Sequence, residues 1–196
     1  IEWEADWLPG YKKSRPVRIG NAAVNQFQLD VFGEVSAALS KTPEAEESIR
    51  IPATSLQASL INHLCDVWQK PDEGIWETRG GQQQFTFSKV MAWVALDRAI
   101  KHHERYDGGD LTRWRKVRDQ IHKQVCEKGF NKELNSFVQS YGSKQLDASC
   151  LRIVMVGFLP PDDPRIRGTV EAIEQRLMKG GFVQRYDTKT TNDGLS

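Results

Sequence analysis

The chain has 196 residues, of which 39% are hydrophobic, so it is long enough to bury a sizeable core in one domain or in part of a larger one. Its 27 basic and 26 acidic residues are spread along the sequence and leave a net charge of +1, which provides no basic face for a nucleic-acid backbone. No apolar run approaches the ~18 residues of a membrane span. We therefore expect neither a nucleic-acid partner nor a membrane partner.

The N-terminal residues and the cysteines bear on where the chain begins in its protein and in which compartment it lies. Residues 1–6 form no signal peptide and include no initiator methionine, so we expect the chain to begin within a longer protein. The cysteines are odd in number and far apart, at Cys65, Cys126 and Cys150. This pattern predicts free thiols in a reducing, cytoplasmic compartment and no disulfide frame or zinc site.

Apolar residues recur at helical spacing of three and four along most of the chain. The pattern predicts six helices, over residues 22–39, 55–68, 88–106, 111–126, 148–159 and 165–178. Pro71 follows the second helix, Asp110 is placed to cap the start of the fourth, and Gly129 lies just beyond its end. The fifth segment is nearly all apolar and is expected to be buried on most sides. Strand patterns are almost absent, so we predict an all-α fold.

The connections between these helices alternate in length. Short links at 107–109 and 160–164 alternate with longer, aromatic- and charge-rich segments at 11–21, 71–87, 130–147 and 182–196. In antiparallel helical hairpins every second connection emerges at the same end, so the four long segments should share one face. This arrangement favours part of an α/α toroid with a mouth built from long loops. A helical solenoid is the alternative, with shorter and more uniform loops.

The segment 72–81 has the most unusual composition of the long loops. It combines Asp72, Glu73 and Glu77 with Trp76, and ends in two glycines. An aromatic ring can stack on the apolar face of a sugar, and a neighbouring carboxyl group can transfer protons. The loop is therefore a candidate sugar site. The alternative is a solvated acidic loop with Trp76 packed into the core.

Several motifs along the chain together resemble one enzyme family. They are RPVRIGNAA at 15–23, QFQLDVFGE at 26–34, DEGIWE at 72–77, SKVMAW at 88–93, GFLP at 157–160, and RY at 185–186 followed by NDGL at 192–195. This set resembles glycoside hydrolase family 15, the glucoamylase-like enzymes, and in particular its bacterial and archaeal branch. The resemblance covers essentially the whole chain.

The resemblance implies a fold, a reaction and a catalytic acid. The family has an (α/α)6 toroid of twelve helices and hydrolyses α-glucosidic bonds with inversion, without a cofactor. Residues 1–196 would then be about half of a catalytic domain, truncated at both ends and inactive alone. Glu77 matches the general acid and Trp76 part of the sugar-binding wall. Burial by Trp76 and repulsion from Asp72 or Glu73 would keep the Glu77 carboxyl protonated. The general base would lie in a later segment, outside this chain.

Some features leave alternatives open. Glu77 could instead pair with Arg79. Thr78 follows Glu77 where fungal glucoamylases carry a second acidic residue, so the linkage preference is open. We expect the chain to contact the missing half of its domain or a second copy of itself.

The resemblance and the loop pattern indicate further substrate-binding candidates. Arg185 matches an arginine that contacts sugar hydroxyls, and its alternative is an ion pair with Asp187. Asp147 begins the fifth helix at the same mouth, where it could bind sugar or cap the helix. Arg18 and Asn21, before the first helix, are weaker candidates. The four histidines show no metal-ligand spacing, so no metal site is predicted.

The functional hypotheses fall into three classes. The first is hydrolysis of an α-linked glucoside, with glucoamylase-type activity on α-1,4 or α-1,6 glucans leading and trehalase close behind. The second is a non-catalytic helical module that binds carbohydrate or serves as a scaffold. The third is a helical-repeat interaction module that binds no sugar.

Overall fold

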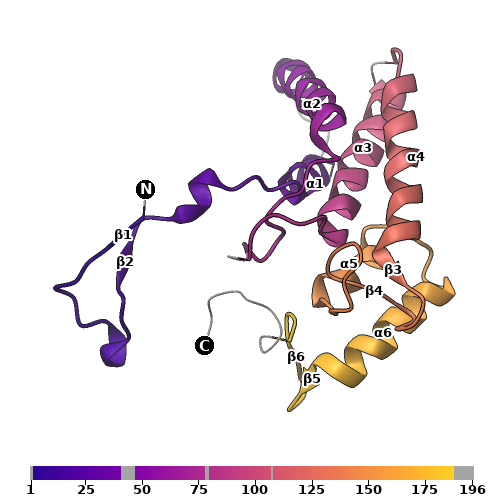
Figure 1. Ribbon diagram of the computed structural model, residues 1–196. Coiled ribbons are helices and arrows are strands. Elements are labelled where there is room, and N and C mark those ends of the chain that lie inside the picture. The colour runs from indigo at the N-terminus through magenta and orange to yellow at the C-terminus, as the bar shows by residue number, and fades with distance from the viewer. Residues whose placement is uncertain (1, 41–46, 78–79, 107, 188–196) are drawn as a thin grey trace.

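The computed structural model describes residues 2–40, 47–77, 80–106 and 108–187, and these are mainly helical (Figure 1). The helices are α1 (Asp30–Leu39), α2 (Glu47–Val67), α3 (Thr86–Tyr106), α4 (Thr112–Gln124), α5 (Arg152–Met155) and α6 (Pro164–Leu177). Three two-residue antiparallel hairpins pair β1 (Trp3–Glu4) with β2 (Arg18–Ile19), β3 (Phe130–Asn131) with β4 (Ser136–Phe137), and β5 (Met178–Lys179) with β6 (Phe182–Val183). The predicted all-α class is confirmed.

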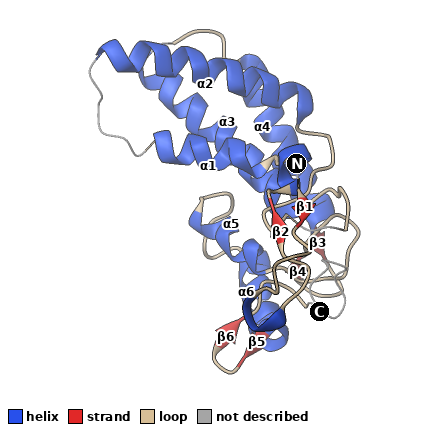
Figure 2. Ribbon diagram, turned by 90° about the vertical axis from the view of Figure 1, so that its left-hand side faces the viewer, coloured by secondary structure: helices blue, strands red, loops and turns tan. Residues whose placement is uncertain are grey.

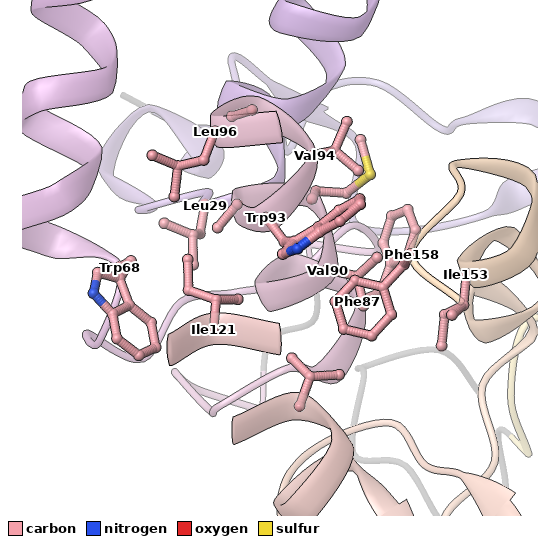
Figure 3. Packing of buried hydrophobic residues seen from close by; sticks show 14 of the residues in the cluster. Leu29, Trp68, Phe87, Val90, Trp93, Val94, Leu96, Ile121, Ile153 and Phe158 are labelled. Carbon is pink, nitrogen blue, oxygen red and sulfur yellow. The ribbon is translucent and has the colours of Figure 1, made fainter. Parts of the chain in front are cut away.

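Helix α3 lies at the centre of the helical part. It contacts α1, α2 and α4, and all of its residues from Thr86 to Asp97 are buried. Figures 1 and 2 show α4 beside α3, with α5 and α6 beyond one end of this group. The core continues from α3 toward α5 and α6 through Trp93. Its ring meets that of Phe158, just after α5, edge-on at a centroid distance of 5.1 Å (Figure 3). One hydrophobic core therefore joins the helical hairpins.

The first predicted helix is split in the structure. A 3₁₀ helix covers Ala22–Asn25, and Gln26 is extended with φ −84° and ψ 142° before α1 begins at Asp30. The break allows the backbone of the intervening residues to pair with the loop that follows α2. The spacing of apolar residues is regular throughout 22–39. It therefore gives no indication that residues before α1 pair with the loop after α2.

The fifth predicted helix is shorter and more exposed than expected. A 3₁₀ helix at Ala148–Leu151 leads into α5, which ends at Met155, and Met155 is 79% exposed. The chain then turns at Gly157, with φ 77°, and places Phe158 in the core. The prediction that this segment is buried on most sides is therefore wrong at Met155. Helix α3, in contrast to α5, is buried along most of its length.

Three of the four long segments meet at one end of the helices. Isolated β-bridges join Asp72 to Gln83, Phe85 to Ser140, and Asp147 to Tyr186. The fourth segment, 11–21, belongs instead to the β1–β2 hairpin, which Figure 1 shows apart from the helices. The prediction of one shared face therefore fails for 11–21, because its backbone pairs with residues 3–5. Residues 188–196 lie outside the described part of the chain.

Two further expectations concern thiols and membranes. The cysteines are free thiols, buried at Cys65 and Cys150 and half-buried at Cys126. Among the described residues, no helix has the length and apolar character needed to cross a membrane, and no cluster of His, Cys, Asp or Glu could hold a metal ion.

Candidate active site

Two of the three loop carboxylates anchor the loop to the start of α1. Asp72 is fully buried, and its Oδ2 accepts hydrogen bonds from the backbone N–H groups of Leu29 and Gly74, both at 3.2 Å. Glu73 Oε2 accepts a bond from the Phe27 N–H at 2.8 Å, and the Glu73 N–H donates to the Phe27 carbonyl at 3.1 Å. Carboxylates that accept backbone N–H bonds fix both partners in place. Asp72 and Glu73 therefore have structural roles.

A buried lysine fixes the other side of the same loop. Lys89 on α3 is fully buried, and its Nζ donates to the carbonyls of Trp68 and Lys70, each at 2.6 Å, where α2 ends. Burial lowers the pKa of Lys89 to about 8, and the charge of Asp72 opposes this change. Burial also raises the pKa of Asp72, against the effect of its N–H donors and Lys89. Lys89 and Asp72 thus hold the loop between α2 and α1.

Glu77, the predicted acid, adopts an unusual backbone conformation. Its φ is 50°, its N–H donates to the Gly74 carbonyl at 3.2 Å, and its Oε1 accepts a bond from Gln28 Nε2 at 2.9 Å. A residue with a side chain at such a φ costs about 1–2 kcal/mol and persists only where its surroundings impose it, often at functional sites. The Glu77 side chain is exposed, so the expected burial by Trp76 is not observed. Arg79, its alternative ion partner, lies outside the described residues.

The indole of Trp76 is oriented by Asp147. Its Nε1 donates to both carboxylate oxygens of Asp147, at 3.0 and 3.1 Å. Asp147 also accepts a bond from Gln139 Nε2 at 3.2 Å and caps the following 3₁₀ helix through the Ser149 N–H at 2.8 Å. Asp147 is 2% exposed. The capping alternative is therefore confirmed, and Asp147 positions Trp76 instead of presenting its carboxylate to solvent.

Arg185 and Tyr186 complete the surroundings of Trp76. The Arg185 guanidinium lies over the Trp76 ring, 5.5 Å from its centroid, and the buried Tyr186 ring meets Trp76 edge-on at 6.3 Å. The Ala148 N–H donates to the Arg185 carbonyl at 2.8 Å, which holds this segment beside Asp147. Three loops thus meet at Trp76. Trp76, Arg185 and Asp147 were predicted from the sequence, whereas Tyr186 was not. The only signal for Tyr186 was its place in the Arg185 motif.

The structure does not bring Arg18 and Asn21 to this group. Arg18 lies in β2 and forms ion pairs with Glu2 at 3.5 Å and Glu4 at 3.6 Å. Asn21 caps the 3₁₀ helix that follows it, where its Oδ1 accepts a bond from the Ala23 N–H at 2.8 Å. Both side chains are exposed. Within the described residues, both side chains interact with near neighbours in their own N-terminal segment, and neither contacts Trp76.

Asp30, the first residue of α1, is a buried carboxyl beside the anchored loop. Burial raises its pKa from 3.8 to about 6, and the nearby Asp72 and Glu34 carboxylates act in the same direction, against Arg152. Glu34 itself receives two bonds from the Arg152 guanidinium, at 2.7 and 3.3 Å. Asp30 is therefore costly to ionise in the folded protein.

We expect Asp30→Asn to stabilise the full-length protein at pH 7 but not near pH 4. Because the pKa of Asp30 is higher in the folded state, its contribution to stability is complete below 3.8 and is lost as the pH rises through about 6. The gain at pH 7 should be about 3 kcal/mol, from 1.36 kcal/mol per pKa unit over the shift from 3.8 to about 6. Urea unfolding at both pH values measures it. Glu171→Gln, at an exposed position of α6, is the control. An equal gain at both pH values would contradict the prediction.

Comparison with known proteins places the chain in a family. The model for "Glycosyl hydrolases family 15" matches residues 2–196. The chain belongs to this family. The family 15 resemblance expected from the motifs is therefore confirmed.

Curated relatives of the chain include several proteins named trehalase. The chain is 42% identical over its whole length to the trehalase of Mycobacterium tuberculosis and covers 29% of that protein. It is 39% identical to the trehalase of Thermoplasma acidophilum, of which it covers 33%. The chain thus spans about a third of the length of these relatives.

Solved glycosidases share the fold of this family 15 chain. A wild-type glycosidase and a glycosidase variant in complex with glucose each superpose with a TM-score of 0.66 at 18% identity. In both cases 92% of this chain matches 50% of the other. The chain therefore has the fold of about half of a larger glycosidase, as expected for part of an α/α toroid.

Proposed function

We propose that residues 1–196 are the acid-bearing part of a longer, inverting glycoside hydrolase that cleaves α-linked glucosides. Glu77 donates a proton to the glycosidic oxygen as the bond from that oxygen to the anomeric carbon breaks. A carboxylate outside this chain removes a proton from water, which attacks the opposite face of the sugar. The observation that carries the proposal is the strained Glu77 beside Trp76, on a loop that three buried or paired side chains hold in place.

Trp76 serves as the wall on which the glucosyl unit stacks. Asp147 fixes its indole N–H, and Arg185 covers its ring. A ring fixed in this way loses little conformational entropy when a sugar binds. The exposed Arg185 guanidinium supplies paired donors suited to vicinal hydroxyls.

Trehalose is the substrate we favour over α-1,4 and α-1,6 glucans. The curated relatives with the highest identities above are named trehalase, and they come from both bacteria and archaea. Glucoamylase-type hydrolysis, the leading hypothesis from the sequence, becomes the second candidate. Both substrates require the same acid, so the site geometry is common to the two.

Hydrolysis of trehalose, maltose and isomaltose by the full-length protein tests this proposal. We expect trehalose to be cleaved fastest, with one α- and one β-glucose released per molecule, because only the attacked anomeric centre inverts. Early NMR spectra of the products, taken before mutarotation, measure this ratio. Release of two α-glucose molecules would contradict inversion. A full-length protein that binds these sugars but hydrolyses none would favour the carbohydrate-binding module.

A further inference from the structure

Three consecutive residues before α1 each contact a different carboxylate of the acid loop. Phe27 pairs through its backbone with Glu73, and the Leu29 N–H donates to Asp72. Between them, the Gln28 side chain donates from Nε2 to Glu77 Oε1 at 2.9 Å. The two backbone contacts on either side fix the position from which Gln28 reaches Glu77.

The break in the first helix makes this arrangement available. In a continuous helix, the N–H groups of Phe27 and Leu29 would donate to carbonyls four residues earlier. Here Gln26 is extended, and both N–H groups donate to carboxylates instead. Gln28 is half-buried, and its Nε2 lies 3.4 Å from Gln26 Oε1 as well. The Gln28 Nε2 therefore donates to two acceptors, Gln26 Oε1 and Glu77 Oε1.

We infer that Gln28 is a positioning residue that selects which oxygen of Glu77 carries the catalytic proton. This inference rests on the proposed role of Glu77 as the acid. An amide N–H binds an oxygen that carries no proton, so Oε1 accepts from Gln28 and Oε2 holds the proton. Among the described residues, Oε2 has no hydrogen-bond partner.

The same bond favours the products of proton transfer. When Oε2 gives its proton to the departing glycosidic oxygen, Glu77 becomes a carboxylate. The Gln28 N–H then donates to a charged acceptor, and such bonds are about twice as strong as neutral ones. Gln28 thus stabilises the transition state more than the ground state, which raises kcat and leaves substrate binding almost unchanged.

The test compares two substrates in the full-length protein. With trehalose, Gln28→Leu should lower kcat about tenfold and change KM less than about twofold. With α-glucosyl fluoride the rate should stay within about twofold, because fluoride departs with little need of a proton donor. Gln28→Met, which keeps the length of the side chain, should behave in the same way.

Gln82→Leu is the matched control. Gln82 also donates from Nε2 to a loop carboxylate, Glu73 Oε1 at 3.1 Å. It does not contact Glu77, so its replacement should leave the ratio of the two substrate rates unchanged. In a Glu77→Gln background, Gln28→Leu should cause no further loss on trehalose, because its effect operates through Glu77.

Several results would overturn the inference. Equal losses on both substrates, no loss on trehalose, or an additive loss in the Glu77→Gln background would each show that Gln28 does not act through the acid. A wild-type protein that hydrolyses neither substrate would instead overturn the proposed hydrolase function. The two failures are therefore distinguishable.

Discussion

Replacement of Glu77 by glutamine is expected to lower kcat for trehalose by about 10³-fold in the full-length protein, with little change in KM. A general acid contributes roughly 10²- to 10⁴-fold, and glutamine has the size of glutamate but no transferable proton. The contacts of Trp76 with Asp147 and Arg185 do not involve Glu77, so sugar binding should persist. Steady-state kinetics with trehalose measure the effect.

Two controls separate loss of the acid from loss of structure. With α-glucosyl fluoride, Glu77→Gln should keep most of the wild-type rate, because this substrate needs little protonation. The thermal unfolding midpoint should also change little, since glutamine keeps the same unfavourable φ of 50°. Wild-type turnover of trehalose by the variant would exclude Glu77 as the acid. Glu133→Gln, at an exposed position, should leave both rates unchanged.

Local rules were sufficient where the structure depends on neighbouring residues. Asp110 was predicted to cap the fourth helix. The cap position is Leu111, one residue later, but Asp110 Oδ1 does accept a bond from the N–H of Thr112, the first residue of α4, at 2.9 Å. Asp163 in the same way caps α6 through the Arg165 N–H, also at 2.9 Å. A cap bond spans two or three residues, so the sequence pattern contains all of its information. Helix existence and order followed from the same short-range signals.

Contacts between distant residues explain what the sequence did not predict. The first helix is split because Phe27 pairs with Glu73, 46 positions away, and Leu29 with Asp72, 43 positions away. Neither contact alters the spacing of apolar residues from which the helix was predicted. Such tertiary pairing overrides local helical preference without leaving a periodic signal.

The candidate site shows the same division. Loop composition and family motifs selected Trp76, Arg185 and Asp147, and the structure brings all three together. Their arrangement in space was not predictable, because the hydrogen bond from Trp76 to Asp147 joins residues 71 positions apart. Only the fold shows that Asp147 lies buried behind the ring. The sequence likewise could not assign different roles to Asp72, Glu73 and Glu77. Those roles depend on whether a carboxylate accepts backbone N–H groups, as Asp72 and Glu73 do, or a side-chain amide, as Glu77 does.

Replacement of Gly33 by alanine is expected to destabilise the full-length protein by about 2 kcal/mol, although alanine is the better helix former. Gly33 lies within α1, where a Cβ atom would be 2.3 Å from the Met91 carbonyl oxygen and 2.8 Å from the Met91 Cβ. Met91 belongs to the buried, central α3 and cannot move aside easily. Overpacking of this kind typically costs 1–3 kcal/mol, which exceeds the gain of about 1 kcal/mol in helix propensity.

Urea unfolding of Gly33→Ala and Ala38→Gly separates packing from propensity. Ala38 is exposed on the same helix, so Ala38→Gly should cost about 1 kcal/mol through propensity alone. If propensity also governed position 33, Gly33→Ala would be stabilising. The close contact with Met91 predicts the opposite sign and the larger loss.

The same substitution should also reduce catalysis at temperatures where the variant is folded. A Cβ at position 33 pushes α1 away from α3, and the residues just before α1 hold Asp72, Glu73 and Glu77. Their displacement would loosen Gln28 from the acid, so kcat for trehalose should fall more than the rate with α-glucosyl fluoride. Loss of stability with an unchanged ratio of these rates would show that the α1–α3 contact does not support the acid loop. A lower ratio would link the glycine in α1 to the position of the proton on Glu77.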